Sequence, residues 1–251
     1  MSVARFLDLA GRTAVVSGAS GGIGGAVARA LAAQGCRVVG LDVAAPRTPL
    51  AHGVEHVDCD LRSADGAEQA ISGCRLAQLD FVVNVAGIDP KHSLQAGGVK
   101  EWASIHDLNL RGYYLLIRAA APLLAAGRGR SIVNVASINT NLGVRRRSIY
   151  SASKAGVLGL TTGLARELGD ARIRINAVSP GWVMTEEQKA EYGFGTPKGA
   201  EVEAYLDGVQ SLRAKRIEPD EIANVVLFLL SSASGAITGT NITADAGWRL
   251  Q

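Results

Sequence analysis

Short runs, most of them apolar, recur along the chain and alternate with longer stretches of helical character. The runs lie at residues 13–17, 37–41, 54–58, 80–85, 131–136 and 173–178. Brief apolar segments are typical of strands that are buried on both faces of a parallel sheet. Because parallel neighbours need crossover connections, the alternation predicts a doubly wound, Rossmann-like α/β fold with helices on both faces of the sheet. Nothing in the chain marks a second domain, and we expect a single domain over residues 1–251.

Three of the intervening stretches carry helical patterns. We expect a polar helix over about 63–73, a long helix over 102–126 and a further helix over about 148–168. Pro122 falls late in the long helix. Proline removes a backbone donor and clashes with the preceding turn, so it predicts a kink or a stop there.

The first strand runs into a glycine-rich loop that opens an alanine-rich helix ending near Gly35. The glycines are Gly18, Gly21, Gly22 and Gly24. They permit close backbone approach, and a helix N-terminus offers unpaired N–H groups and the positive end of a dipole. The arrangement therefore predicts a site for a dinucleotide pyrophosphate, with a plain tight turn as the alternative.

Acidic residues end the next two strands. Asp42 closes the second run, 18 residues beyond Gly24, about where a carboxylate meets the hydroxyls of an adenosine ribose. A carboxylate there would repel a 2′-phosphate, which favours NAD over NADP. Asp60 and Leu61 follow the third run and could flank an adenine ring, although Asp60 could equally cap a helix.

A phenol and an ammonium lie four residues apart in the helix that follows the fifth strand. Tyr150 and Lys154 share one helix face, and Ser137 sits at the carboxyl end of the strand, where open α/β sheets place their ligands. A neighbouring lysine cation lowers the pKa of a tyrosine, which could then take a proton from an alcohol. Ser137 could donate a hydrogen bond to the same oxygen. The alternative is a surface helix that carries an incidental tyrosine and lysine.

Composition excludes several other classes of protein. With 26 basic and 23 acidic residues the formal charge is +3, too balanced to indicate nucleic acid or a membrane surface as a partner. No signal peptide or membrane span is expected, so the predicted location is the cytoplasm. The three cysteines lack metal or disulfide spacing, and His52 and His56 do not lie on a convincing helix, so no metal is predicted.

Taken together, these motifs resemble those of the short-chain dehydrogenase/reductase family over essentially the whole chain. Members bind NAD or NADP on a Rossmann-like sheet and interconvert alcohols and carbonyls. The resemblance implies a catalytic set of Asn109, Ser137, Tyr150 and Lys154. It implies cofactor contacts, besides Tyr150 and Lys154, from Gly18, Ser20, Gly22, Ile23, Gly24, Asp42, Asp60, Leu61, Asn84, Ala86, Gly87, Pro180, Gly181, Val183 and Thr185.

By the same resemblance, Tyr150 is the general acid and base, and Lys154 lowers its pKa and holds the nicotinamide ribose. Asn109 supports a water relay to Lys154, and members are commonly homotetramers built on the two long helices. Two positions depart from the family pattern. Ser17 replaces the usual threonine, and Val85 replaces the second asparagine of the motif around Asn84.

Substrate identity is expected to reside in three variable segments, among them a loop or helix insertion at about 181–215. Polar residues of these segments predict a polyhydroxylated substrate such as an aldose. They are His92, Asn139, Asn141, Glu186 and Gln188, with Ser137 and Tyr150 at the reacting oxygen. The alternatives are a ketone or 3-oxoacyl reductase and, more remotely, a non-catalytic dinucleotide sensor. Arg145, Arg146 and Arg147 are expected in a solvated or subunit-facing loop and not in an anion site.

Overall fold

A parallel sheet of seven strands forms the centre of the molecule in the computed structural model, which describes residues 7–46 and 51–250. The strands are β1 Thr13–Ser17, β2 Arg37–Asp42, β3 Val54–Asp58, β4 Phe81–Asn84, β5 Ser131–Val135, β6 Arg174–Pro180 and β7 Asn241–Ala244. Their order in the sheet is β3-β2-β1-β4-β5-β6-β7. This topology confirms the doubly wound fold, and the order of the strands reverses between β1 and β4.

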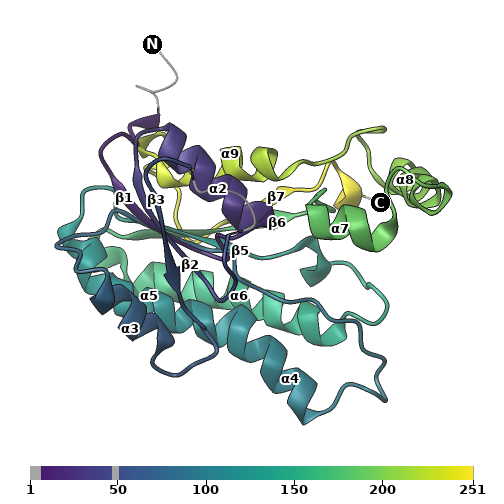
Figure 1. Ribbon diagram of the computed structural model, residues 1–251, viewed down its shortest axis with the longest axis horizontal. Helices are drawn as coiled ribbons and strands as arrows, with labels where there is room; N and C mark the ends of the chain where they lie inside the picture. The colour runs from purple at the N-terminus through teal and green to yellow at the C-terminus, as the bar shows by residue number, and fades with distance from the viewer. Residues whose placement is uncertain (1–6, 47–50, 251) are drawn as a thin grey trace.

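Helices cover both faces of the sheet, as Figure 1 shows. On one face lie α2 Gly22–Ala33 and α9 Pro219–Leu230, whose buried residues share a core cluster with alternate residues of β1 and β4. On the other lie α3 Gly66–Gly73, α5 Gly112–Ala126 and α6 Ser148–Glu167. The central strands are therefore buried on both sides, which explains their nearly continuous apolar sequence.

The predicted helices are present, with different boundaries. The stretch expected as one helix over 102–126 begins earlier, as α4 Val99–His106, and passes through a π-helical turn, Asp107–Arg111, into α5. Pro122 lies inside α5, which continues to Ala126, so of the two expected outcomes at this proline, a kink or a stop, the stop is excluded. The polar helix begins at Gly66, three residues later than expected, with Asp65 at its N-cap position.

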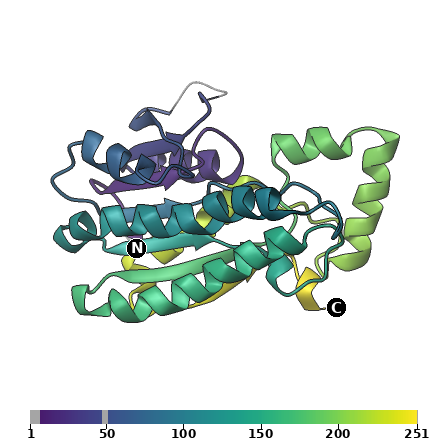
Figure 2. The same cartoon turned by 90° about the horizontal axis from the view of Figure 1, so that it is seen from below.

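Two further helices occupy the segment that was expected to be an insertion. These are α7 Glu186–Tyr192 and α8 Pro197–Val209, and both project beyond the carboxyl end of the sheet (Figure 2). Thr185 is the N-cap of α7, and its hydroxyl accepts a hydrogen bond from the Gln188 N–H at 3.3 Å. The same end of the sheet carries the C-terminal turn at Trp248–Leu250.

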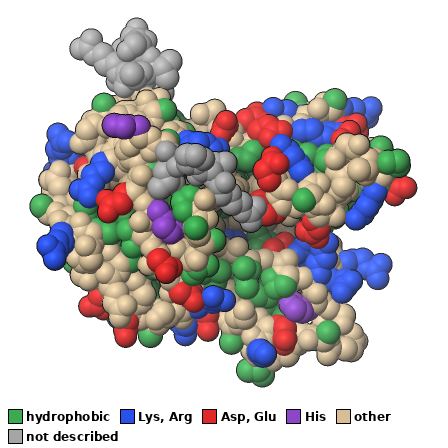
Figure 3. Space-filling view, viewed as in Figure 1, with side chains coloured by type: hydrophobic (Ala, Val, Ile, Leu, Met, Phe, Trp, Pro, Cys, Tyr) green, Lys and Arg blue, Asp and Glu red, His purple; other side chains and the backbone are tan. Residues whose placement is uncertain are grey.

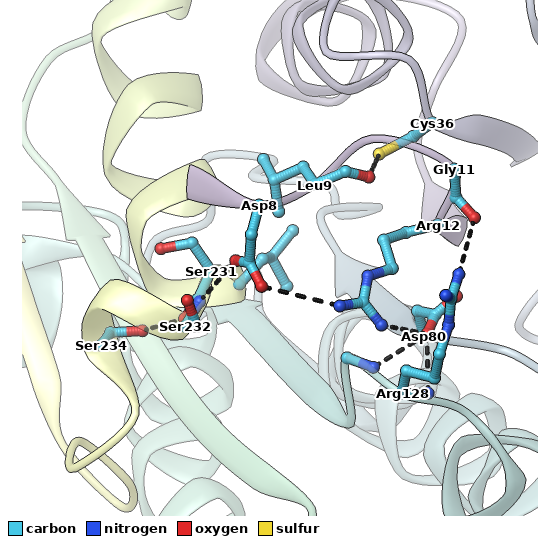
Figure 4. Close-up of polar contacts among 12 residues, drawn as sticks. Asp8, Leu9, Gly11, Arg12, Cys36, Asp80, Arg128, Ser231, Ser232 and Ser234 are labelled. Atoms are coloured by element: carbon cyan, nitrogen blue, oxygen red, sulfur yellow. Dashed lines mark hydrogen bonds and ion pairs between the residues drawn. The ribbon is translucent and has the colours of Figure 1, made fainter. Parts of the chain in front are cut away.

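The amino end of the sheet is closed by a polar network around Asp80, which directly precedes β4 (Figure 4). One carboxylate oxygen accepts the N–H groups of Arg128 and Gly129, both at 2.8 Å, and the other accepts the Thr13 N–H at 3.0 Å. Arg12 adds an ion pair at 3.5 Å. Asp80 thus joins β1, β4 and the turn before β5.

Acidic and basic side chains are interspersed over the face shown in Figure 3. Within the described ranges, no helix is long and apolar enough to cross a membrane. The described part of the chain also holds no group of three or more His, Cys, Asp or Glu side chains that could bind a metal ion.

Candidate functional site

The glycine-rich loop packs closely against the turn that follows β4. Gly18 has a φ of +70°, and a Cβ placed there would lie 2.9 Å from the backbone of Ala86. A Cβ at Gly24 would lie 2.1 Å from the carbonyl oxygen of Gly18. The Ser17 hydroxyl accepts the N–H groups of Val85 at 3.0 Å and Ala86 at 3.2 Å. Ser17 therefore supplies the hydroxyl that joins β1 to the turn after β4. At the next position, Gly18, no residue with a Cβ would fit.

The N-terminus of α2 has no side-chain cap. Gly21 at its N-cap position offers no side chain, and the first turn holds no acidic residue. An uncapped helix start of this kind can bind a pyrophosphate through its free N–H groups. A Cβ at Gly22 would lie 3.5 Å from the methyl group of Thr185, so the start of α7 lies across from the loop. These residues fit the dinucleotide expected from the sequence.

Asp42, at the end of β2, braces the same loop. Its carboxylate accepts the N–H groups of Ser20 and Ala44, both at 3.0 Å, and the Ser20 hydroxyl donates to the Ala44 carbonyl at 2.6 Å. These contacts fix the carboxylate at the edge of the loop, where an adenosine ribose is expected.

Asp60 and Leu61 differ in their surroundings. Arg62 binds the carboxylate of Asp60 through its side chain and backbone at 2.9 Å, and this hydrogen bonding lowers the pKa of Asp60. Asp60 does not cap α3, which rules out the helix-cap alternative. Leu61 is 3% exposed and belongs to the core.

Asn109 holds the turn beyond β4 from within the π-helical segment. Its side chain is fully buried, accepts the Ile88 N–H at 2.9 Å, and donates to the Ile88 carbonyl at 2.9 Å and the Ser153 hydroxyl at 3.1 Å. A Cβ at Gly87 would lie 3.2 Å from the Asn109 amide oxygen. Asn84 is also buried and donates to Asn134 at 2.8 Å.

A cavity of about 450 Å³ at the carboxyl end of the sheet brings Ser137, Tyr150 and Lys154 together. Lys154 is 3% exposed, and its Nζ donates to the Val135 carbonyl at 2.8 Å and the Tyr113 hydroxyl at 3.2 Å. Residues of the predicted cofactor set also line this cavity: Ile23, Gly87, Pro180, Gly181, Val183 and Thr185.

The protonation of this pair differs from the sequence-based expectation. Burial raises the pKa of Tyr150 to about 12; Asp89 adds to this, and a hydrogen bond with Ser137 opposes it. Burial lowers the pKa of Lys154 to about 7. The Lys154 Nζ lies 6.0 Å from the centroid of the Tyr150 ring and makes its hydrogen bonds elsewhere. Proximity on one helix face therefore does not by itself activate the phenol.

Only part of the predicted substrate set lines the cavity. Asn139 and Gln188 do so, together with Ser137 and Tyr150. Glu186 is 83% exposed at its side chain and pairs with Lys189, whereas His92 and Asn141 lie outside the lining. Helical spacing explains the difference within α7, because Glu186 and Gln188 point to different sides of a helix.

A buried ion pair on the cavity wall was not predicted. Arg147 is 9% exposed, and its Nη1 lies 2.5 Å from an Asp89 carboxylate oxygen and also donates to the Asp89 carbonyl. The expectation of a solvated loop is therefore wrong for Arg147, although Arg146 is exposed. Burial raises the pKa of Asp89 to about 6, with Arg147 opposing the shift. The sequence offered only the charges themselves, 58 residues apart.

Aromatic side chains form a second wall, and these were also missed. They are Trp182, Tyr192, Tyr205 and Trp248. The rings of Trp182 and Trp248 lie nearly parallel with centroids 6.4 Å apart, and Tyr192 meets Trp182 edge to face at 4.7 Å. The buried indole Nε1 of Trp182 has no hydrogen-bond partner among the described residues. It is thus a free donor in the lining of the cavity.

The glycine-rich loop lies next to the cavity at the carboxyl edge of the parallel sheet, where open α/β proteins bind their ligands. The comparisons with known proteins identify a nicotinamide-dependent oxidoreductase acting on CH–OH groups. Residues 18–249 match the family model described as enoyl-(acyl carrier protein) reductase. The chain belongs to the short-chain dehydrogenase/reductase family.

Named relatives and solved structures cover nearly the whole chain. D-xylose 1-dehydrogenase of Caulobacter vibrioides is 33% identical, with 99% of this chain and 100% of the relative covered. The ligand-free aldohexose dehydrogenase of Thermoplasma acidophilum has a TM-score of 0.90 at 28% identity, with 98% and 97% covered. A candidate 2-deoxy-D-gluconate 3-dehydrogenase of Agrobacterium tumefaciens with bound NADP has a TM-score of 0.85 at 30% identity, with 97% and 98% covered.

Proposed function

We propose that the protein oxidises an aldose or a similar polyhydroxylated substrate, with NAD as the hydride acceptor. The observation that carries this proposal is the Asp89–Arg147 pair, which is buried on the wall of the cavity that holds Tyr150 and Lys154. A carboxylate accepts and a guanidinium donates hydrogen bonds, so together they suit the hydroxyls of a sugar. An alkyl chain in the same place would give neither group a hydrogen bond beyond those that the pair already makes within itself.

Four residues carry the chemistry in this proposal. Tyr150 exchanges the proton of the reacting hydroxyl, Ser137 orients that oxygen, and Lys154 provides the positive charge beside them. Asn109 supports this set by holding the Ile88 turn and Ser153, which is the role that its hydrogen bonds favour over a direct contact. The nicotinamide supplies the hydride chemistry when it is bound.

NAD is the cofactor that Asp42 favours. A 2′-phosphate carries nearly two negative charges and would lie against the carboxylate that braces Ser20. A solved structure similar to this chain holds NADP, so membership of the family does not by itself select NAD, and the proposed preference depends on this carboxylate.

The alternative is a ketone or 3-oxoacyl reductase. The aromatic wall and the acyl-carrier name of the matching family model favour it. The segment at 181–215 would serve either substrate, because Thr185, Gln188, Tyr192 and Tyr205 all reach the cavity from it.

The two functions separate in a substrate screen. We expect kcat/KM for aldoses to exceed that for cyclohexanol and for a 3-hydroxyacyl thioester, and removal of one ring hydroxyl to cost about 10-fold or more. Faster turnover of either apolar substrate would contradict the sugar assignment and favour the reductase.

We also propose that the protein forms a homo-oligomer, as a tetramer built on the two long helical stretches around 102–126 and 148–168. Large exposed apolar side chains support this, since Val99 is 87%, Trp102 50% and Tyr114 44% exposed on α4 and α5. Light scattering coupled to gel filtration gives the mass, and a monomer at micromolar concentration would contradict the proposal.

A further inference from the structure

The ammonium of Lys154 donates hydrogen bonds to two groups that do not belong to the predicted catalytic set. Its Nζ donates to the Val135 carbonyl at 2.8 Å and to the Tyr113 hydroxyl at 3.2 Å. An ammonium has three N–H donors. Two of these donors are used within the protein. Because Lys154 lines the cavity, the third N–H is left for a partner in the cavity.

Tyr113 reaches this position from α5 and is completely buried. Its ring packs with Ala136, Val157 and Ala177, and its hydroxyl lies 3.4 Å from the same Val135 carbonyl. Burial raises the pKa of Tyr113 well above its usual value, so the phenol remains a neutral acceptor. Phenol, carbonyl and ammonium thus form a closed set of hydrogen bonds at the end of β5.

We propose that Tyr113 is a positioning residue: its hydroxyl fixes the Lys154 ammonium and stabilises its charge at the floor of the cavity. Removing an ammonium from water disfavours its charged form, and a hydrogen bond to the charged form opposes this. Burial lowers the pKa of Lys154 to about 7, so a single acceptor affects its charge near neutral pH. The consequence for turnover rests on the proposed role of Lys154, whereas the consequence for its titration does not.

Other groups face the same ammonium. Burial lowers the pKa of Lys154, the charge of Asp89 opposes this shift, and Arg147 is bound to Asp89. Tyr150 lies on the same helix, with its ring centroid 6.0 Å from Nζ. A change at Tyr113 that preserves its ring leaves all three in place, so the effect of the hydroxyl can be isolated.

The test compares Tyr113→Phe with the matched variant Tyr114→Phe. Tyr114 is the next residue of α5 and is 44% exposed. The titration of Lys154 is followed in the enzyme without cofactor by NMR of 13Cε-labelled lysine, and its resonance is assigned by its loss in Lys154→Arg. Because charge-assisted hydrogen bonds are strong, we expect the midpoint to fall by roughly one pH unit in Tyr113→Phe and to stay unchanged in Tyr114→Phe.

Turnover supplies the second readout. Loss of the lysine charge lowers activity as the pH rises, so the decline on the alkaline side should move to lower pH in Tyr113→Phe. An unchanged lysine titration in this variant would overturn the proposal, whereas a shifted titration with an unchanged pH profile of kcat would contradict the role proposed for the lysine charge in turnover. If Lys154→Arg keeps full activity, the proposed role of Lys154 fails, and the titration still decides whether Tyr113 stabilises its charge.

Discussion

The two ends of the sheet hold cavities of similar size and opposite character. The cavity at the amino end measures about 420 Å³ and the one at the carboxyl end about 450 Å³. At the amino end Arg174 alone donates to five acceptors, four carbonyls of residues 229–231 and 237 and the Ser234 hydroxyl. At the carboxyl end the Trp182 indole N–H is unpaired within the described chain. The two cavities therefore do not differ in volume. They differ in whether the polar groups beside them already have hydrogen-bond partners in the protein.

Two buried aspartates express this difference most clearly. Both are desolvated, yet three backbone N–H groups hold the pKa of Asp80 below its usual value, whereas the pKa of Asp89 is raised to about 6. Asp80 therefore stabilises the fold above the ordinary carboxyl pKa of 3.8, and this contribution is lost as the pH falls through its lower folded pKa. Asp89 favours the folded state below 3.8, and this contribution is lost as the pH rises through about 6.

The largest effect is expected at the carboxyl end, from Tyr150→Phe. The change removes the proposed acid and base while leaving the glycine loop intact, so kcat should fall by about 10²-fold or more. NAD binding, measured by calorimetry, should remain nearly unchanged. A variant that kept more than about a tenth of the wild-type rate would contradict the role given to Tyr150.

At the amino end, Asp80→Asn should affect stability instead of chemistry. The amide can accept fewer of the three N–H groups that Asp80 binds, so we expect a loss of about 3 kcal/mol in urea unfolding at pH 7. The difference from wild type should shrink as the pH falls below 3.8, because the unfolded chain then binds a proton at Asp80 before the native carboxylate does. Asp220→Asn, whose side chain is 80% exposed in the wild type, is the control. A reduced kcat in the folded variant would contradict the assignment of a purely structural role to Asp80.

A smaller effect is expected from Asp42→Ala, which tests the cofactor side of the carboxyl end. Removal of the carboxylate should narrow the preference for NAD over NADP by about 10-fold in kcat/KM, through the loss of repulsion and of a ribose acceptor. Equal use of both cofactors by the wild type would show that Asp42 does not select the nucleotide.

The sequence predicted those parts of the site that a strand end or a helical repeat positions. Ser137, Tyr150 and Lys154 meet because parallel strands end at one edge and because four residues make about one helical turn. Asp89 and Arg147 meet only through the path of two loops, which no local pattern encodes. Tyr113 resembles any other buried residue of α5, and its hydroxyl matters only because Lys154 lies beside it.

In the fold, too, local sequence patterns predicted some elements, whereas elements that depend on distant contacts were missed. Six of the seven strands were predicted to within about two residues, because burial on both faces leaves an apolar run in most of them. The run of β7, Asn241–Ala244, was not among those predicted, and its residues are only partly buried. The helix at Pro219–Leu230 was missed, although Pro219 at its first turn and Glu221 in a capping box with Glu218 are recognised start signals. Its apolar residues cover the sheet beside α2, so their role depends on a contact between distant segments.

The smallest effect should come from Asp89→Asn, and it is the one that most sharpens the contrast between the two aspartates. Asparagine keeps one acceptor for Arg147 but cannot ionise, so we expect kcat/KM for aldoses to fall about fivefold at pH 7.5. We expect wild-type activity to rise as Asp89 ionises near pH 6, and this rise should be absent from the variant. Asp80→Asn, which changes the aspartate at the other end of the sheet, should retain that rise. An identical pH profile in Asp89→Asn and wild type would mean that this carboxylate does not contact the substrate, and would remove the main structural support for a sugar in this cavity.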